Sequence, residues 1–349
     1  DRYSRQVLTG DLEKIRTFYM NRGYLDFDIK NTTVSISETK KNVYIAIIID
    51  EGDKYTFGDI KISGKYYPLT EESIFQNDIK TKKGEVFSRK LLNESTESIN
   101  QELGNYGYAF SNVNPIPDVD KENLIVGFNY FIEPGKKVYV RRISFVGNEK
   151  TKDKVLRREM RQFEASYYDK EKIDQSTRRL KRTQYFEGVD IKTVSVPGIS
   201  DQVDLTVAVK EKNTGSVKLG AGASSDEGLV GSFSVTQANF LGTGNTVSAT
   251  INTSSVNTVY SISHIDPYYT LDGISRRITA YTKETNTKDL DTGQYDKKSL
   301  GLGVGFGIPM NEYDTVNIGF DVDMSEIKLV SSSPTRVPFT TSPGNVRGA

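Results

Sequence analysis

Strict alternation of apolar and polar residues dominates the second half of the chain. One run places glycines between the apolar residues Leu300, Leu302, Val304, Phe306 and Ile308. A period of two predicts β-strands with one apolar face and one small or polar face. On this pattern we expect seven strands, near residues 216–224, 229–240, 245–256, 258–266, 276–285, 299–308 and 315–328.

The first half of the chain combines helical and strand patterns in a module that recurs about every eighty residues. Gly52 and Gly135 are 83 residues apart, and Gly64 and Gly147 have the same spacing. Fixed spacings of this kind indicate repeated supersecondary units that share one fold. We expect three such modules, over residues 1–52, 53–136 and 137–213, followed by the alternating region 214–349.

The third module has the clearest pattern, and it predicts the order β-α-α-β-β. A strand ends at Gly147, and a helix is expected from about Thr151. Its buried stripe, with spacing i, i+4, i+7, would contain Leu156, Met160 and Phe163. A second helix from about Asp169 and two strands complete the module. The second module repeats this order, and the first shows only a helix and two strands, so we expect its missing elements upstream of Asp1.

Charge and glycine content change near residue 213. Residues 1–213 carry 69 charged side chains and 13 glycines, whereas residues 214–349 carry 23 and 16. A charge-poor, alternating region favours a transmembrane β-barrel, with lipid outside and a wet lumen inside, over a soluble β-sandwich. Seven strands do not close an even-numbered barrel, so further strands are expected beyond Ala349. Aromatic residues at the strand ends are expected to lie at the membrane interface, namely Tyr268, Tyr269 and Tyr313.

The composition argues against most enzymatic and metal chemistry. The chain has no cysteine and a single histidine, His264, which excludes thiolate and histidine-cluster metal sites. The net charge is zero, so no basic field favours nucleic acid. Asp321 and Asp323 are neighbours on one strand face, where a solvated wall is the simpler interpretation than an acid–base pair. We therefore expect no catalytic residues, no metal and no cofactor.

Several segments together resemble the BamA family of outer-membrane protein assembly factors. They are residues 155–162 (VLRREMRQ), 214–216 (TGS), 239–244 (NFLGTG), 266–269 (DPYY) and 306–313 (FGIPMNEY). The resemblance covers nearly the whole chain. It implies that the fold is α+β, with β-α-α-β-β POTRA domains followed by the N-terminal part of an antiparallel transmembrane β-barrel. The modules would be the third, fourth and fifth POTRA domains of five.

The same resemblance implies a function and a set of partners. The barrel would lie in the bacterial outer membrane and the POTRA domains in the periplasm. Unfolded outer-membrane proteins would arrive from periplasmic chaperones, accessory lipoproteins of the BamB and BamD type would bind the POTRA domains, and substrate strands would be templated and released into membrane lipid. Small sheets with open edges suit the capture of extended chains, although edges blunted by Lys and Glu would bind nothing.

Two groups of residues carry these implied roles. A charged helix face made of Arg157, Arg161 and Glu164 is expected to bind the BamD-like lipoprotein, and the alternative is a solvated face with an internal ion pair. The first barrel strand is expected to be the edge of a lateral gate. Its residues are Ser216, Val217, Lys218, Leu219, Gly220, Ala221, Gly222 and Ala223.

Two other functions remain open at this stage. A POTRA-barrel translocator, as in two-partner secretion, would export proteins across the outer membrane through the same architecture. A passive porin with a periplasmic binding module would conduct solutes without assembling barrels.

Overall fold

The computed structural model describes residues 4–37, 42–225, 227–287, 295–312 and 314–329. The chain forms two compact units. The first comprises Asp1–Ser144, Arg161–Ser176 and Ile191–Thr206, and the second comprises Phe145–Met160, Thr177–Asp190 and Val207–Ala349. The third module therefore contributes segments to both units.

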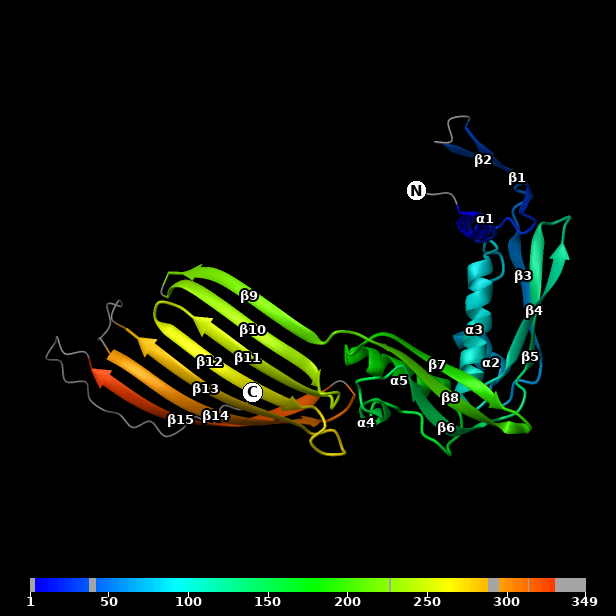
Figure 1. Ribbon diagram of the computed structural model, residues 1–349. Coiled ribbons are helices and arrows are strands. Elements are labelled where there is room, and N and C mark those ends of the chain that lie inside the picture. The colour runs from blue at the N-terminus through cyan, green and yellow to red at the C-terminus, as the bar shows by residue number, and fades with distance from the viewer. Residues whose placement is uncertain (1–3, 38–41, 226, 288–294, 313, 330–349) are drawn as a thin grey trace. The chain divides into compact units, whose positions relative to one another are not determined.

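The order of elements follows the predicted modules (Figure 1). The first module contains α1 (Arg5–Met20), β1 (Asp28–Ile36) and β2 (Val43–Asp50). The second contains β3 (Thr56–Gly64), α2 (Glu71–Asn77), α3 (Arg89–Asn105), β4 (Asn112–Asp120) and β5 (Ile125–Glu133). The third contains β6 (Tyr139–Val146), α4 (Asp153–Arg157), α5 (Lys170–Arg182), β7 (Phe186–Val196) and β8 (Ile199–Glu211). Both full modules thus have the order β-α-α-β-β.

The spaced glycines of the sequence repeat occupy equivalent positions in these modules. The two three-stranded sheets have the orders β3-β5-β4 and β6-β8-β7. Gly64 ends β3 with φ +95°, and Gly147 follows β6 with φ +85°. A Cβ at Gly64 would overlap the carbonyl oxygen of Ile132, and one at Gly147 would overlap that of Val209. Only glycine fits a left-handed residue so close to a neighbouring strand, which explains the 83-residue spacing.

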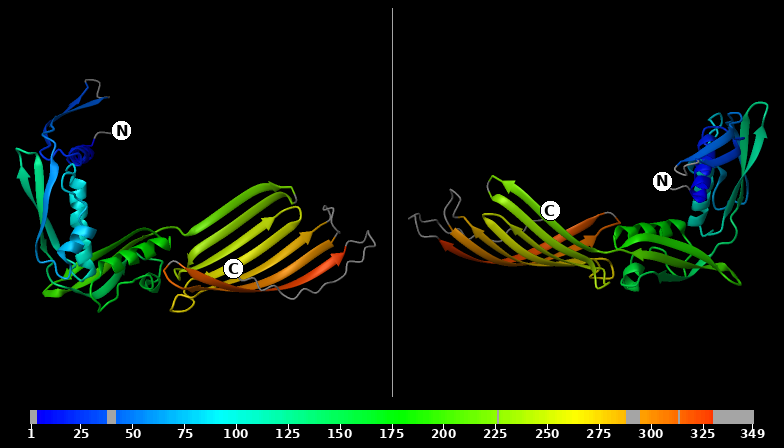
Figure 2. Two further views of the ribbon diagram at one scale, coloured as in Figure 1. Left: turned by 180° about the vertical axis from the view of Figure 1, so that it is seen from behind. Right: turned by 45° about the horizontal axis from the view of Figure 1, so that its top comes forward.

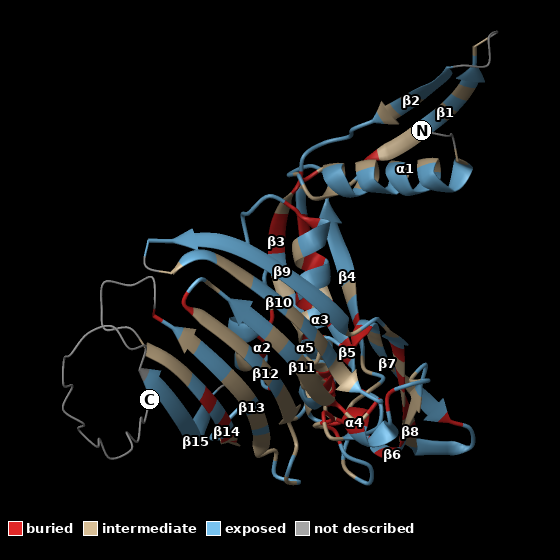
Figure 3. Cartoon of the chain, turned by 60° about the vertical axis from the view of Figure 1, so that its left-hand side comes forward, coloured by how far each residue is buried: buried red, intermediate tan, exposed pale blue. Residues whose placement is uncertain are grey.

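The second module has a hydrophobic core between its sheet and its helices. Its fully buried side chains include Tyr55, Phe57, Ile74, Ile99 and Leu103. Figure 3 shows buried residues gathered in the modules. The side chain of Thr70 caps α2 by accepting a hydrogen bond from the Ser73 amide at 3.1 Å. Packing of an apolar helix face on a small sheet therefore holds this module together.

The prediction for the first helix of the third module was too long. α4 ends at Arg157, and Phe163, expected in the buried stripe, is 64% exposed, although Leu156 and Met160 are buried as predicted. The buried side chain of Gln162 orders the loop that follows the helix. Its amide donates to Ser166 Oγ at 2.8 Å and to the Tyr167 carbonyl at 2.9 Å, which holds the chain in a loop.

The start of α4 and the position of α5 differ from the prediction by only one or two residues. α5 begins at Lys170 and buries Ile173 and Leu180, as expected. α4 is preceded by Lys152 at its N-cap, whereas Thr151 uses its hydroxyl in another contact, described below. No helix within the described ranges is long and apolar enough to cross a membrane.

The last seven strands form one antiparallel sheet, as the alternation predicts. They are β9 (Gly215–Ser224), β10 (Gly228–Phe240), β11 (Asn245–Thr253), β12 (Asn257–Asp266), β13 (Ser275–Asn286), β14 (Tyr295–Pro309) and β15 (Thr315–Leu329). Each strand pairs with the next in sequence, so β9 and β15 are the two edges. Figures 1 and 2 show this continuous sheet.

The register separates an apolar face from a polar face. One row of directly opposed residues runs across the seven strands as Leu219, Phe233, Ile251, Tyr260, Thr282, Leu300 and Met324. The adjacent row runs as Lys218, Ser234, Thr250, Ser261, Tyr281, Gly301 and Asp323. A lipid-facing side and a lumen-facing side differ in the same way, and the sheet therefore has the face pattern of a transmembrane barrel wall.

Glycines on the polar face make room for a tyrosine. The ring of Tyr281 lies over Gly301, and its hydroxyl donates to Asp323 Oδ1 at 2.8 Å. A side chain at position 301 would occupy the space of that ring. This contact joins β13, β14 and β15 on the side away from the apolar band.

We expect Gly301→Val to destabilise the sheet by about 1–3 kcal/mol, because the new side chain must displace the Tyr281 ring. The temperature at which the detergent-folded full-length protein loses its compact mobility on unboiled gels measures the effect. Gly305→Val is the matched control, since a Cβ there meets its nearest atom at 3.7 Å. Equal melting of the two variants would contradict this account of the glycine.

Candidate functional site

The β9 edge of the seven-stranded sheet is the most distinctive candidate site. β9 pairs with β10 from Gly215 opposite Gln237 to Ser224 opposite Gly228. Among the strands that the structure describes, none pairs with the other side of β9. Every residue of β9 is exposed. An edge of this kind presents a row of backbone donors and acceptors to which another strand can add.

The residues predicted for the first barrel strand all lie in β9. Val217 and Leu219, which are 64% and 82% exposed, belong to the apolar face together with Ala221 and Ala223. The polar face contains Ser216, Lys218, Gly220 and Gly222. The sequence therefore predicted both the position and the two faces of this strand correctly.

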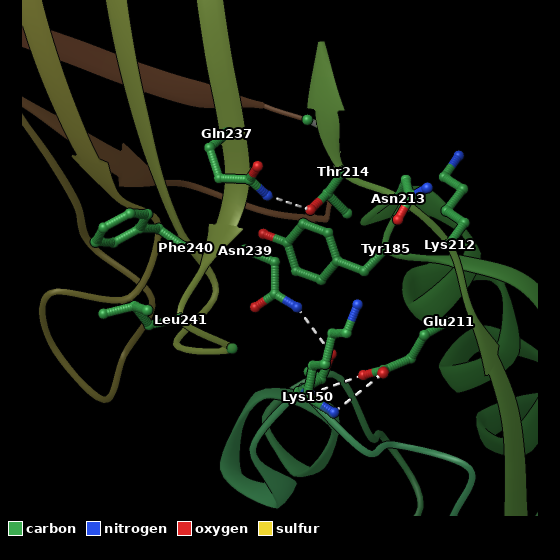
Figure 4. A pocket seen from close by; sticks show the side chains of 13 residues that line it. Lys150, Tyr185, Glu211, Lys212, Asn213, Thr214, Gln237, Asn239, Phe240 and Leu241 are labelled. Carbon is green, nitrogen blue, oxygen red and sulfur yellow. Dashed lines mark hydrogen bonds between the residues drawn. The ribbon is translucent and has the colours of Figure 1, made fainter.

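The root of β9 is fastened to β10 by hydrogen bonds around an open pocket (Figure 4). Thr214 Oγ1 donates to the Ala238 carbonyl at 2.6 Å and accepts from Gln237 Nε2 at 2.7 Å. The Ala238 amide donates to the Thr214 carbonyl at 3.2 Å. These bonds fix the start of the strand while its outer edge stays open.

The turn between β10 and β11 packs against the loop that precedes α4. Both segments belong to the second compact unit. Asn239 Nδ2 donates to Thr151 Oγ1 at 2.8 Å, and the Lys152 amide donates to the Gly242 carbonyl at 3.0 Å. Tyr185, between α5 and β7, donates its hydroxyl hydrogen to the Gly244 carbonyl at 3.0 Å. The third module thus contacts the root of the sheet through ordered hydrogen bonds.

A second contact, the arginine cluster, joins α5 to two further turns of the sheet. Arg179 contacts Glu159 Oε2 at 2.9 Å and Glu312 Oε2 at 2.6 Å, and it donates to the Tyr268 hydroxyl at 2.7 Å. The Tyr268 hydroxyl donates to Glu159 at 3.2 Å, and the Arg158 guanidinium lies 4.3 Å above the Tyr268 ring. The side chains of Glu159 and Arg179 are 8% and 17% exposed. A shielded pair with this many partners holds its geometry firmly.

The electrostatics of the cluster keep both Arg179 and Tyr268 protonated. Burial favours loss of the Arg179 charge, but the carboxylate of Glu159, the phenol of Tyr268 and the carboxylate of Glu312 outweigh it, so the pKa of Arg179 is raised. Burial and then the negative charge of Glu159 raise the pKa of Tyr268. The tyrosine therefore remains a protonated hydrogen-bond donor at neutral pH.

The loop before α4 is also held by a carboxylate of β8. Glu211 accepts hydrogen bonds from the amides of Lys150 at 3.0 Å and Thr151 at 2.7 Å. Burial opposes its charge, but the hydrogen bonds from Thr151 and Lys150 prevail and lower the pKa of Glu211. The ionised form is therefore the one that orders this loop.

The charged residues predicted to share one helix face do not do so. Arg157 is the last residue of α4, and its guanidinium lies 5.2 Å from the ring centroid of Phe145. Arg161 and Glu164 follow after the helix has ended, and Glu164 Oε1 accepts a hydrogen bond from the Ile143 amide at 2.8 Å. The predicted helix face was therefore wrong, because α4 ends at Arg157 and is too short to include Arg161 and Glu164.

Sequence reasoning missed the arginine cluster. Tyr268, for which the membrane interface was expected, also bonds within the cluster, and Tyr313 lies outside the described residues. Tyr269 is 49% exposed, as an interfacial residue would be. The only sequence signal for the cluster was that Glu159, Tyr268 and Glu312 fall in the segments that carry the family resemblance. Within the described ranges, no three His, Cys, Asp or Glu side chains gather as a metal site would require.

Comparison with known proteins agrees with this architecture. The POTRA family model, described as surface antigen variable number repeat, matches residues 1–52, 55–135 and 138–212. The Omp85 superfamily domain matches residues 239–342. The chain belongs to the POTRA–Omp85 family. It is thus an outer-membrane protein with POTRA domains on the periplasmic side.

Relatives within this family share most of the chain. The chain is similar to the outer membrane protein assembly factor BamA of Neisseria meningitidis, with 33% identity over 96% of this chain and 42% of that protein. The BamA protein of Buchnera aphidicola is 29% identical over 91% of this chain and 51% of its own length. The chain therefore spans about half the length of these curated relatives.

Solved structures show the same arrangement of elements. BamA from Haemophilus ducreyi lacking POTRA domains 1–3 matches with a TM-score of 0.70 and 31% identity, over 80% of this chain and 52% of that one. The Haemophilus influenzae BamA POTRA3-5 structure matches with a TM-score of 0.55 and 30% identity, over 58% of this chain and 80% of that one. These likenesses support POTRA domains followed by part of an antiparallel barrel.

We expect Arg179→Met to loosen the turn between β12 and β13 of this POTRA–Omp85 protein. The substitution leaves the shielded Glu159 with fewer partners, and breaking a buried pair costs about 3–5 kcal/mol, less here because Arg158 remains 3.7 Å away. Hydrogen exchange at the Tyr269 amide, which bonds the Ile274 carbonyl at 2.9 Å, should quicken at least about tenfold.

The neighbouring exposed residue supplies the control for this measurement. Arg178→Met removes the same group from the same helix, outside the cluster. Exchange at Tyr269 should be unchanged by it. If both variants exchange equally fast, the cluster does not hold the turn.

Proposed function

We propose that this chain is the periplasmic and leading barrel portion of an outer-membrane protein insertase. The POTRA domains receive unfolded barrel proteins, and β9 pairs with their strands at a lateral gate. The open edge of β9 is the observation that carries this proposal. Relatives named outer membrane protein assembly factor support it.

The physical chemistry of the membrane explains why such an edge would act on other chains. Each backbone N–H or C=O left without a partner in hydrocarbon costs several kcal/mol. An incoming strand that pairs with β9 removes that cost for both partners. A completed substrate barrel has no open edge of its own, so it can leave the template and remain in lipid. No nucleotide or other energy source is needed for these steps.

The POTRA domains offer further strand edges on the periplasmic side. In the two full modules, β3, β4, β6 and β7 are edge strands. Ile116 and Val119 on β4 are 44% and 37% exposed, which suits the side chains of an extended apolar segment. We infer that unfolded substrates delivered by periplasmic chaperones add to such edges transiently.

We further propose that accessory lipoproteins of the BamB and BamD type bind the POTRA domains. The BamD-like partner would contact the third module of this chain through Arg157, Arg161 and Glu164. The three residues follow closely in sequence, and their charges suit a partner surface with complementary charges. This proposal rests on the family resemblance of residues 155–162, which contain Arg157 and Arg161 and end two residues before Glu164, and not on a shared helix face.

The gate can be tested by closing it. In the full-length protein, Gly222→Cys on β9 paired with a cysteine on the final barrel strand should stop substrate insertion when oxidised, and reduction should restore it. A Cβ at position 222 meets no atom within 4 Å, and the chain has no native cysteine. The measurement is insertion of a barrel substrate into vesicles that contain the insertase.

A disulfide inside the sheet controls for the effect of cross-linking itself. Ser234→Cys with Thr250→Cys joins β10 to β11, whose hydroxyls are 3.1 Å apart in the parent. This disulfide should leave insertion intact. Undiminished insertion by the fully cross-linked β9 variant would rule out the gate.

The docking residues require a variant that separates charge from structure. Glu164→Lys and Arg157→Glu should each weaken co-purification of the BamD-like lipoprotein about tenfold or more. Each substitution reverses a charge that we propose faces an opposite charge on the lipoprotein. Glu164→Gln keeps an oxygen acceptor for the Ile143 amide, so loss of binding in this variant as well would point to charge and not to loop structure. Unaltered co-purification with correctly folded Arg157→Glu protein would refute the docking role.

A further inference from the structure

A single charged side chain lies on the open edge strand. Lys218 is the only charged residue of β9, and it belongs to the polar face of the sheet, directly opposite Ser234 on β10. Its neighbours on the same face of β9 are Ser216 and Gly220. The ammonium group therefore stands beside small groups at the position where an added strand would place its own side chains.

The sheet itself offers this lysine no carboxylate. Across the strands, the row that begins at Lys218 continues through the hydroxyl residues Ser234, Thr250 and Ser261. The only carboxylate of the row, Asp323, is on β15 at the opposite edge and already accepts a hydrogen bond from Tyr281. Among the described residues, the Lys218 ammonium makes no ion pair or hydrogen bond.

Antiparallel or parallel addition to β9 would fill the empty side of Lys218 with one residue of the new strand. Directly opposed side chains on one face of a sheet have Cβ atoms about 4.5–5.5 Å apart, close enough for an ion pair. Opposite charges at such positions stabilise strand pairing, and like charges oppose it. Pairing at this edge thus depends on the charge of one side chain, the one on the polar face of the added strand that lies opposite Lys218.

We infer that Lys218 is a specificity-determining residue that favours substrate strands with Asp or Glu at the lumen-facing position opposite it. The inference rests on the proposed function, because it concerns strands that pair with β9. It adds a chemical requirement to that function: apolar residues opposite Val217 and Leu219, and a carboxylate opposite Lys218. Strands with Lys or Arg at this position are disfavoured, so the edge discriminates among alternating strands that are equally apolar.

Disulfide capture in the full-length protein tests this requirement. Gly222→Cys on β9 and a cysteine moved along the final strand of a barrel substrate define the register. The substrate then carries Asp, Asn or Lys at the position opposite residue 218. The ratio of capture rates for Asp over Lys is measured within each insertase variant, so any general change in assembly cancels.

The native lysine should favour Asp over Lys by about two- to thirtyfold, the range expected when a cross-strand attraction replaces a repulsion. Lys218→Gln should bring this ratio close to one, and Lys218→Glu should invert it. The preference of the native protein should shrink in high salt, because salt screens exposed charges. Lys283→Gln is the control, since Lys283 lies on the same face in the interior of the sheet, opposite Val259 and Ser299.

The possible results separate this inference from the proposed function. If no substrate strand is captured at β9 by any variant, the gate itself is refuted. If capture occurs but the Asp-to-Lys ratio is unchanged in Lys218→Gln and Lys218→Glu, the role of Lys218 is refuted and the gate stands. An equal fall of the ratio in Lys283→Gln would show that overall lumen charge, and not the edge lysine, sets the preference.

Discussion

Backbone hydrogen bonding at the edge of a membrane sheet is the constraint on which this protein depends. Every strand from β10 to β14 has partners on both sides, whereas β9 has one partner among the described strands. In water the unpaired backbone groups of such an edge can bond to solvent, whereas in hydrocarbon each unpaired group costs several kcal/mol. A protein that keeps this edge in place must hold the strand firmly at one end while leaving its outer side accessible. The hydrogen bonds around Thr214 meet the first requirement.

The contacts of the third module extend this support beyond β9. The turn after β10 bonds to the loop before α4, and the turns after β12 and β14 meet at Arg179 on α5. All of these segments lie in one compact unit. These segments of the third module are thereby bonded directly to the sheet. Strain at α5 would reach two turns of the barrel directly, without passing through β9.

Periodicity was sufficient to predict the sheet, and it failed at the end of α4. Alternation fixes which residues face each way once the register is known, so β9 to β15 were predicted nearly residue by residue. The apolar spacing of Leu156, Met160 and Phe163 is equally regular, yet α4 ends at Arg157, and the buried amide of Gln162 bonds to the backbone of the loop that follows. Pattern rules count apolar residues and do not weigh such a side chain. The arginine cluster was beyond prediction because Glu159 and Glu312 come together only in the folded chain.

The turn after β10 is recognised mainly through its main chain. The carbonyl oxygens of Gly242 and Gly244 accept the bonds from Lys152 and Tyr185, and a Cβ at Gly242 would overlap the Lys150 carbonyl. Leu241, immediately before Gly242, is 76% exposed and takes no part in these bonds. Substitutions are therefore tolerated unevenly at the neighbouring positions 241, 242 and 244. Leu241 has φ +51°, so exposed unbranched residues can replace it at little cost, whereas Gly242, with φ +69° and the Lys150 carbonyl beside it, admits no side chain.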